Sequence, residues 1–195
     1  MANQDAAFGF RPIGKVGQNR DNQGLSEYNI AASASAIFQN DPVQFLATGT
    51  IGVANTTTAV LLGSLNGVFY TDATDQKPRW ANHLAASNTA TDIVGFVSDD
   101  PYERFEVQSS TTLAIADIGL NADISYAAGT SPNFVSKVEV DTTSANMTTA
   151  TAQFRVLGVT KDINNNELSN VTTYAANVNV VGIINEHFLK STTGI

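Results

Sequence analysis

The feature that most limits the fold is the close spacing of turn signals, which leaves room for short strands but not for long helices. After Asn29, apolar runs of about four to six residues alternate with clusters of glycine, proline, asparagine and aspartate. Residues 93–97 (IVGFV) and 154–159 (FRVLGV) are two such runs. No helical periodicity extends beyond about two turns. The sequence therefore predicts an all-β fold, a sandwich or barrel of short antiparallel strands.

Three local patterns refine this expectation. Asn66-Gly67 is a strong tight-turn pair and predicts a turn before the strand at residues 68–70. Residues 71–92 contain Pro78 and lack a long apolar segment, which predicts a long loop. Gly95 and Gly158 each lie inside an apolar run, where a glycine often marks a bulge or a barrel corner.

The first residues differ from the rest. The stretch FGFRPIGKVGQNRDNQGLSEY begins at Phe8 and carries Arg11, Lys15 and Arg20 without sustained periodicity. This composition predicts an extended N-terminal arm, residues 1–27, ahead of a β-rich body, residues 28–195. Such an arm could reach roughly 90 Å at about 3.3 Å per residue. The alternative is that residues 8–16 form the first strand of the barrel.

Charge and composition exclude several functions. The chain has 195 residues, a net charge of −8 and no cysteine, so disulfides and cysteine chemistry are excluded. Acidic residues concentrate between Asp92 and Asp141, where only Arg104 and Lys137 oppose them. A general nucleic-acid binder would need a basic stripe, so nucleic acid is not an expected partner. No apolar run is long enough to span a membrane and no signal segment is apparent, which predicts synthesis in a cytoplasm.

Candidate chemistry is sparse. His83 and His187 lie far apart in the sequence, and no nucleophile motif accompanies either, so both are expected at the surface or an interface. Asp99 and Asp100 could serve acid–base chemistry or calcium, but an Asp-Pro turn with side chains in water or capping backbone amides explains them more simply. The sequence predicts no enzyme, no catalytic residue, no metal and no cofactor.

A family resemblance complements these observations. The segments AAFGFRPIGKVGQN, FVSDDPYERFEVQ and IADIGLNADI resemble structural proteins of tailed bacteriophages, along most of the chain. In general character the chain is also similar to capsid decoration, or cement, proteins. The resemblance implies a virion structural protein, made in the host bacterial cytoplasm, that binds the outer surface of the capsid and stabilises it. The implied partners are the major capsid protein and two further copies in a homotrimer.

The resemblance also suggests which residues make contacts. In the arm, the expected contacts with the capsid or a neighbouring copy are Phe8, Phe10, Arg11, Ile13, Lys15 and Arg20. Tyr70 and Trp80 are candidates for contacts between copies. Two alternatives stay open: a tail or fibre-associated protein that recognises a host receptor or carbohydrate, and a small polysaccharide hydrolase with a carboxylate pair in a cleft.

Overall fold

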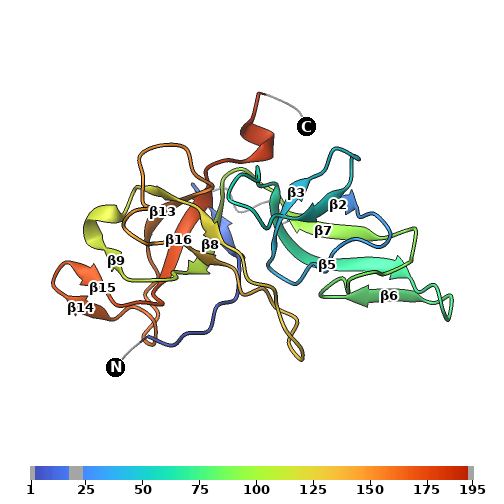
Figure 1. Cartoon of the computed structure of the whole chain (residues 1–195), viewed down its shortest axis with the longest axis horizontal. Coiled ribbons are helices and arrows are strands. Elements are labelled where there is room, and N and C mark those ends of the chain that lie inside the picture. Colours follow the sequence, from blue (N-terminus) through green and yellow to red (C-terminus); the bar gives the residue numbers. More distant parts are fainter. Residues whose placement is uncertain (1–2, 18–23, 193–195) are drawn as a thin grey trace.

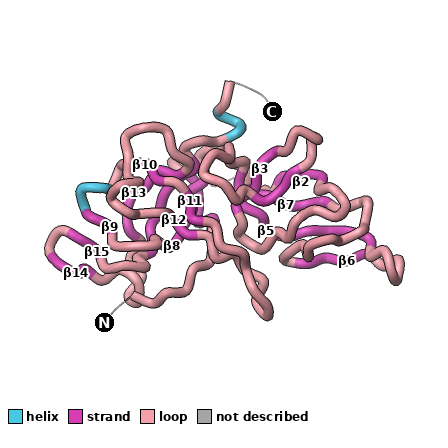
Figure 2. The backbone as a smooth tube through the Cα atoms, in the orientation of Figure 1, coloured by secondary structure: helices cyan, strands magenta, loops and turns pink. Residues whose placement is uncertain are grey.

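The computed structural model describes residues 3–17 and 24–192, and its strands confirm the expected all-β fold (Figures 1 and 2). Within these residues, helical structure is limited to two single-turn 3-10 helices, η1 (Ile115–Asp117) and η2 (Phe188–Lys190). The first eight strands are β1 Arg11–Lys15, β2 Ser26–Asn29, β3 Pro42–Phe45, β4 Ile51–Val53, β5 Gly63–Thr71, β6 Pro78–Ala81, β7 Val94–Ser98 and β8 Glu103–Gln108. The remaining strands are β9 Leu113–Ala114, β10 Asn121–Ala122, β11 Ile124–Ser125, β12 Glu139–Val140, β13 Phe154–Val159, β14 Leu168–Asn170, β15 Thr173–Tyr174 and β16 Asn179–Ile184.

Two main antiparallel sheets organise the chain. One has five strands in the order β1-β8-β16-β13-β10. The other has six strands, with β2-β7-β5-β3-β4 in line and β6 paired to β5. Strands β11-β12 and β14-β15-β9 form two smaller sheets. In Figure 1 the five-stranded sheet lies in the left half of the molecule and the six-stranded sheet in the right half.

Each main sheet buries one face against its own apolar cluster. The five-stranded sheet contributes Phe105, Phe154 and Val180 to the larger cluster. The six-stranded sheet contributes Leu65 and Val97, among others, to the second cluster. Alternation along each strand sends every second side chain into the cluster and its neighbour to the opposite face.

The described part of the N-terminal segment is built into the body. Strand β1 pairs with β8, and Phe10 just before it is fully buried in the larger cluster. The Phe10 amide donates to the Asn40 carbonyl at 2.8 Å, and the Phe10 carbonyl accepts from Ser64 Oγ at 2.7 Å. For residues 11–15 the structure therefore takes the alternative of a first strand rather than the extended arm. The chain then builds the six-stranded sheet before it returns beside β1 as β8.

Two local predictions are wrong. Asn66-Gly67 makes no turn, because β5 runs straight through it with a bulge that leaves Asn66 unpaired. Gly67 serves packing instead, since a Cβ there would lie 2.9 Å from the Ala81 carbonyl oxygen. The expected loop at residues 71–92 contains strand β6, which begins at Pro78 and tolerates the missing N–H because it is an edge strand. The bulge beside Gly158 was predicted correctly, whereas Gly95 pairs in regular register with Tyr28 and Val68 and marks no bulge in β7.

Candidate functional site

The acidic segment that joins the two sheets makes its contacts within the chain. Asp99 accepts hydrogen bonds from Ser26 Oγ at 2.9 Å and from Tyr28 Oη at 2.5 Å. Asp100 forms an ion pair with Lys15 and accepts from the Tyr102 amide at 2.7 Å. Burial of Asp100 opposes its ionisation, but these two donors hold the pKa of Asp100 below its ordinary value. Both carboxylates therefore tie strands β1, β2 and β7 together. Asp100 caps a backbone amide, as the Asp-Pro turn interpretation expected, whereas the contacts of Asp99 with two side-chain hydroxyls and of Asp100 with Lys15 were not expected.

The expected arm contacts are mostly engaged inside the molecule. Phe10 lies between Phe105 and Phe154, with ring centroids 5.6 and 5.2 Å away, and has no exposed surface to offer. Arg11 forms an ion pair with Glu106, and its guanidinium lies 4.4 Å from the centre of the Phe8 ring.

The remaining arm candidates divide between paired, exposed and undescribed residues. Lys15 is the partner of Asp100, as described above. Ile13 is 43% exposed and stays available for a contact, whereas Arg20 lies outside the described residues. Within the described segment, the candidates that keep surface for contact with another molecule are therefore Ile13, part of Phe8 and the outer side of Arg11.

Tyr70 and Trp80 lie on opposite faces of the six-stranded sheet. Tyr70 packs against the second apolar cluster. Trp80 is opposite Phe69 in the β5–β6 pair, and Phe69 is opposite Val94 in the β5–β7 pair. Directly opposed residues share a face, so these three side chains project away from the cluster. Trp80 is thus the better of the two candidates for contact with another molecule.

We call the group Phe69, Trp80, Val94 and Phe96 the aromatic face. Trp80 is 59% exposed and Phe69 is 39% exposed. The Trp80 indole lies beside Gly67, and its ring centroid is 4.5 Å from that of Phe96. One part of the indole is thereby fixed against the sheet while the rest faces solvent. Val94 and Phe96 belong to the apolar run at residues 93–97, and both are partly buried in the structure.

The two histidines have different surroundings. His187 is only 2% exposed, so its predicted surface location is wrong. Burial, and secondarily the charge of Lys190, lowers the pKa of His187 to about 4. His187 Nδ1 accepts from the Leu189 amide at 3.1 Å and caps η2. His83 is partly buried and stacks on Phe134, with ring centroids 3.9 Å apart. Both histidines therefore have structural contacts.

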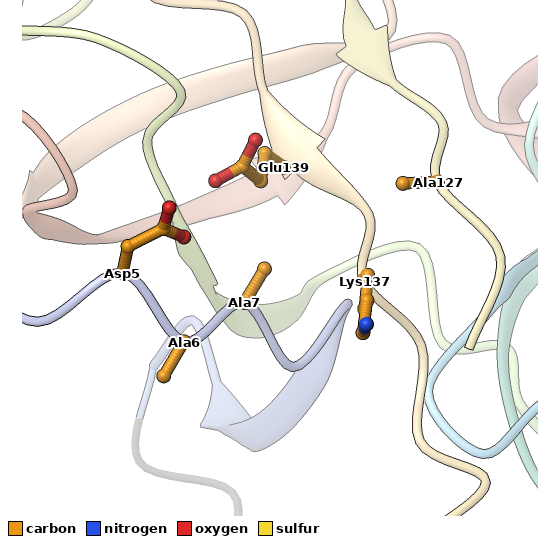
Figure 3. Close-up of a pocket in the computed structure, with 6 residues that line it drawn as sticks. All are labelled: Asp5, Ala6, Ala7, Ala127, Lys137 and Glu139. Carbon is orange, nitrogen blue, oxygen red and sulfur yellow. The ribbon is translucent and has the colours of Figure 1, made fainter. Parts of the chain in front are cut away.

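A pocket of about 420 Å³ opens beside the N-terminal segment (Figure 3). Its walls come from residues 5–7, from the loop residue Ala127, from Lys137 and from β12. Its lining residues are Asp5, Ala6, Ala7, Ala127, Lys137 and Glu139. The carboxylates of Asp5 and Glu139 lie near each other in Figure 3, whereas the Lys137 side chain lies apart from them. Burial, and secondarily the charge of Asp5, raises the pKa of Glu139.

Two further observations concern ligands and membranes. Among residues 3–17 and 24–192, no three acidic or histidine side chains are placed to hold a metal ion. No helix in the described part of the chain is long and apolar enough to cross a bilayer.

Comparisons with family models, with curated proteins and with solved structures found no match to this chain.

Proposed function

We propose that this chain is a virion structural protein that binds the outer surface of an assembled phage capsid and stabilises it. The proposed partner is the major capsid protein, and the protein acts by contact, without catalysis and without a cofactor. The observation that carries the proposal is the aromatic face, which adds a structural reason to the sequence resemblance described above.

The aromatic face has the composition of a protein interface. Aromatic residues are enriched at interfaces, and Trp is one of the residues that most often dominates binding free energy. An antiparallel sheet with one solvated face usually carries polar residues there. Here that face carries Phe69, Trp80, Val94 and Phe96, of which Trp80 is more than half exposed and Phe69 more than a third. Burying these side chains against a shell subunit would stabilise the complex in proportion to the apolar area removed from water.

Many copies acting together would explain how a modest contact can reinforce a shell. If each copy bridges neighbouring capsid subunits, every subunit gains several contacts that must break together before the shell can open. A homotrimer would extend this effect, because its three copies would bind as one multivalent unit.

The exposed indole also favours a second candidate function. A tail or fibre-associated protein could use Trp80 to stack on a sugar ring of a host carbohydrate, with Glu27 and Asn29 of β2 on the same side of the sheet as Phe96 and Val94. Location in the particle separates the two functions. A decoration protein lies over the shell, and a recognition protein lies on the tail.

Replacing Trp80 by alanine tests the proposed function. Affinity for capsids of the same virus that lack this protein should fall by at least roughly 30-fold, because a central interface Trp contributes about 2 kcal/mol or more. Leu168→Ala is the control, since Leu168 is 47% exposed on β14, away from the aromatic face. Co-sedimentation with capsids gives the affinities.

Two outcomes of this experiment distinguish the proposed function from the proposed binding surface. Wild-type protein that fails to bind any capsid at physiological ionic strength would reject the proposed function. A Trp80→Ala variant that decorates capsids with wild-type affinity would leave the function standing and reject the aromatic face as its binding surface.

A further inference from the structure

The outer face of the five-stranded sheet gathers arginines that are far apart in the sequence. In one cross-strand row, Ile183 of β16 lies opposite Arg155 of β13 and opposite Arg104 of β8. In the next row, Val181 lies opposite Glu106, which lies opposite Arg11 of β1. We call Arg11, Arg104, Arg155, Val181 and Ile183 the arginine face. Glu106 is the one carboxylate in these two rows, on a chain whose net charge is −8.

The arginines of this face are held in different ways. Arg155 donates to Asn121 Oδ1 at 2.9 Å and to Asn185 Oδ1 at 2.8 Å. Arg11 is held by Glu106. Arg104 is exposed and forms no hydrogen bond or ion pair among the described residues, and Glu103 is the carboxylate that its charge influences. Val181 and Ile183 between them are partly exposed. An apolar centre flanked by arginines is typical of protein interfaces, where Arg is enriched and binds carboxylates with a planar fork of donors.

The Asp5–Glu139 pocket has the complementary chemistry. Neither carboxylate forms an ion pair within the described part of the chain. Ala6, Ala7, Ala127 and Lys137 line the rest of the pocket. The small alanine side chains leave space for an incoming side chain, and the Lys137 side chain lies apart from the two carboxylates. A guanidinium placed between two facing carboxylates would relieve their mutual repulsion, and it would form charge-assisted hydrogen bonds that are stronger than neutral ones. The pocket therefore fits the unpaired arginine of another molecule.

We propose that copies of this chain associate head to tail, with Arg104 of one copy bound in the Asp5–Glu139 pocket of the next. Two arginine faces would not pair with each other, because Glu106 is already engaged by Arg11 and leaves Arg104 and Arg155 of each copy without an opposing carboxylate. The contact therefore joins different surfaces of the two copies, and such heterologous contacts produce closed rings or open filaments rather than two-fold dimers. The inference concerns contact between copies and does not depend on what the aromatic face binds.

Charge reversal tests the pairing in the full-length protein. At low ionic strength the wild-type chain should associate in sedimentation velocity, and Arg104→Glu and Glu139→Arg should each weaken association at least roughly 30-fold. The double variant Arg104→Glu/Glu139→Arg restores one opposite-charge pair at each contact and should regain most of the association. Asp5→Arg replaces Glu139→Arg if that half-buried substitution prevents folding, since Asp5 is exposed. Lys161→Glu, an exposed loop substitution with the same change in charge as Arg104→Glu, is the matched control.

Each result has a defined meaning. Association of wild type that weakens in Arg104→Glu, persists in Lys161→Glu and returns in the double variant would support the proposal. A wild-type chain that stays monomeric at low ionic strength and high concentration would overturn it, as would a double variant that associates no better than the single ones. Capsid binding by Trp80→Ala is measured separately, so failure of one proposal is distinguishable from failure of the other.

Discussion

Replacing Phe10 by alanine is expected to lower the free energy of unfolding by about 3–5 kcal/mol, the usual cost of deleting a buried phenylalanine ring. Phe10 is fully buried, and its ring packs on Phe105 and Phe154. The loss would leave a cavity between β1, β8 and β13. Because small domains are stable by only about 5–15 kcal/mol, the variant should unfold at clearly lower denaturant concentration. Urea or guanidinium unfolding followed by circular dichroism measures the change.

Ile13→Ala is the matched control, because Ile13 follows three residues later and is 43% exposed. Its unfolding free energy should change by less than about 1 kcal/mol. The arm hypothesis implies the opposite outcome for Phe10, since an arm that is free of the body contributes little to its stability. A Phe10→Ala variant as stable as wild type would therefore show that the segment does not pack as described. The arm hypothesis also implies that removing residues 2–20 leaves a stable body, whereas loss of Phe10 and β1 should destabilise it.

The architecture was accessible from sequence because strand propensity and turn chemistry are local properties. Residues 154–159 and 93–97 gave strands β13 and β7 to within one residue. The turn predicted at Asn66-Gly67 is absent because long-range packing overrides the local turn preference. Strand β5 continues through the pair, and the glycine is needed where the Trp80 side chain and the Ala81 carbonyl approach the backbone. A single sequence contains no signal for that approach.

The candidate surfaces illustrate the same limit. Trp80 could be singled out because an aromatic residue in a polar stretch is unusual. That Trp80 and Tyr70 lie on opposite faces of the sheet follows from the pairing of β5 with β6, and β6 had been predicted as loop. The basic residues Arg11 and Lys15 were conspicuous in sequence, yet each is paired with a carboxylate from the acidic stretch. Arg104 and Arg155 were inconspicuous, because they are 51 residues apart and only the register through β16 brings them into one row.

Buried Asp41 provides the second prediction of large effect. Asp41 has no exposed surface, and its Oδ1 has no hydrogen-bond partner. Burial raises the pKa of Asp41 from 3.8 to about 6. The folded state therefore holds this proton more tightly than the unfolded state does. The resulting stabilisation is fully present below about pH 3.8 and is lost as the pH rises through about 6. At about 1.4 kcal/mol per pKa unit, Asp41 costs about 3 kcal/mol of stability at pH 7.

Asp41→Asn should remove this cost, because an amide stays neutral and its oxygen can still accept the Phe38 amide hydrogen bond. The variant should be more stable than wild type by about 2–3 kcal/mol at pH 7, and the difference should shrink as the pH falls and vanish near pH 4. Denaturant unfolding at a series of pH values measures it. Because the pKa of His187 is lowered to about 4, this histidine also makes the folded protein less stable as the pH falls over this range. Wild type and variant both contain His187, so its effect cancels in the difference between them. A wild-type-minus-variant difference that is constant from pH 4 to pH 7 would mean that Asp41 does not carry the raised pKa.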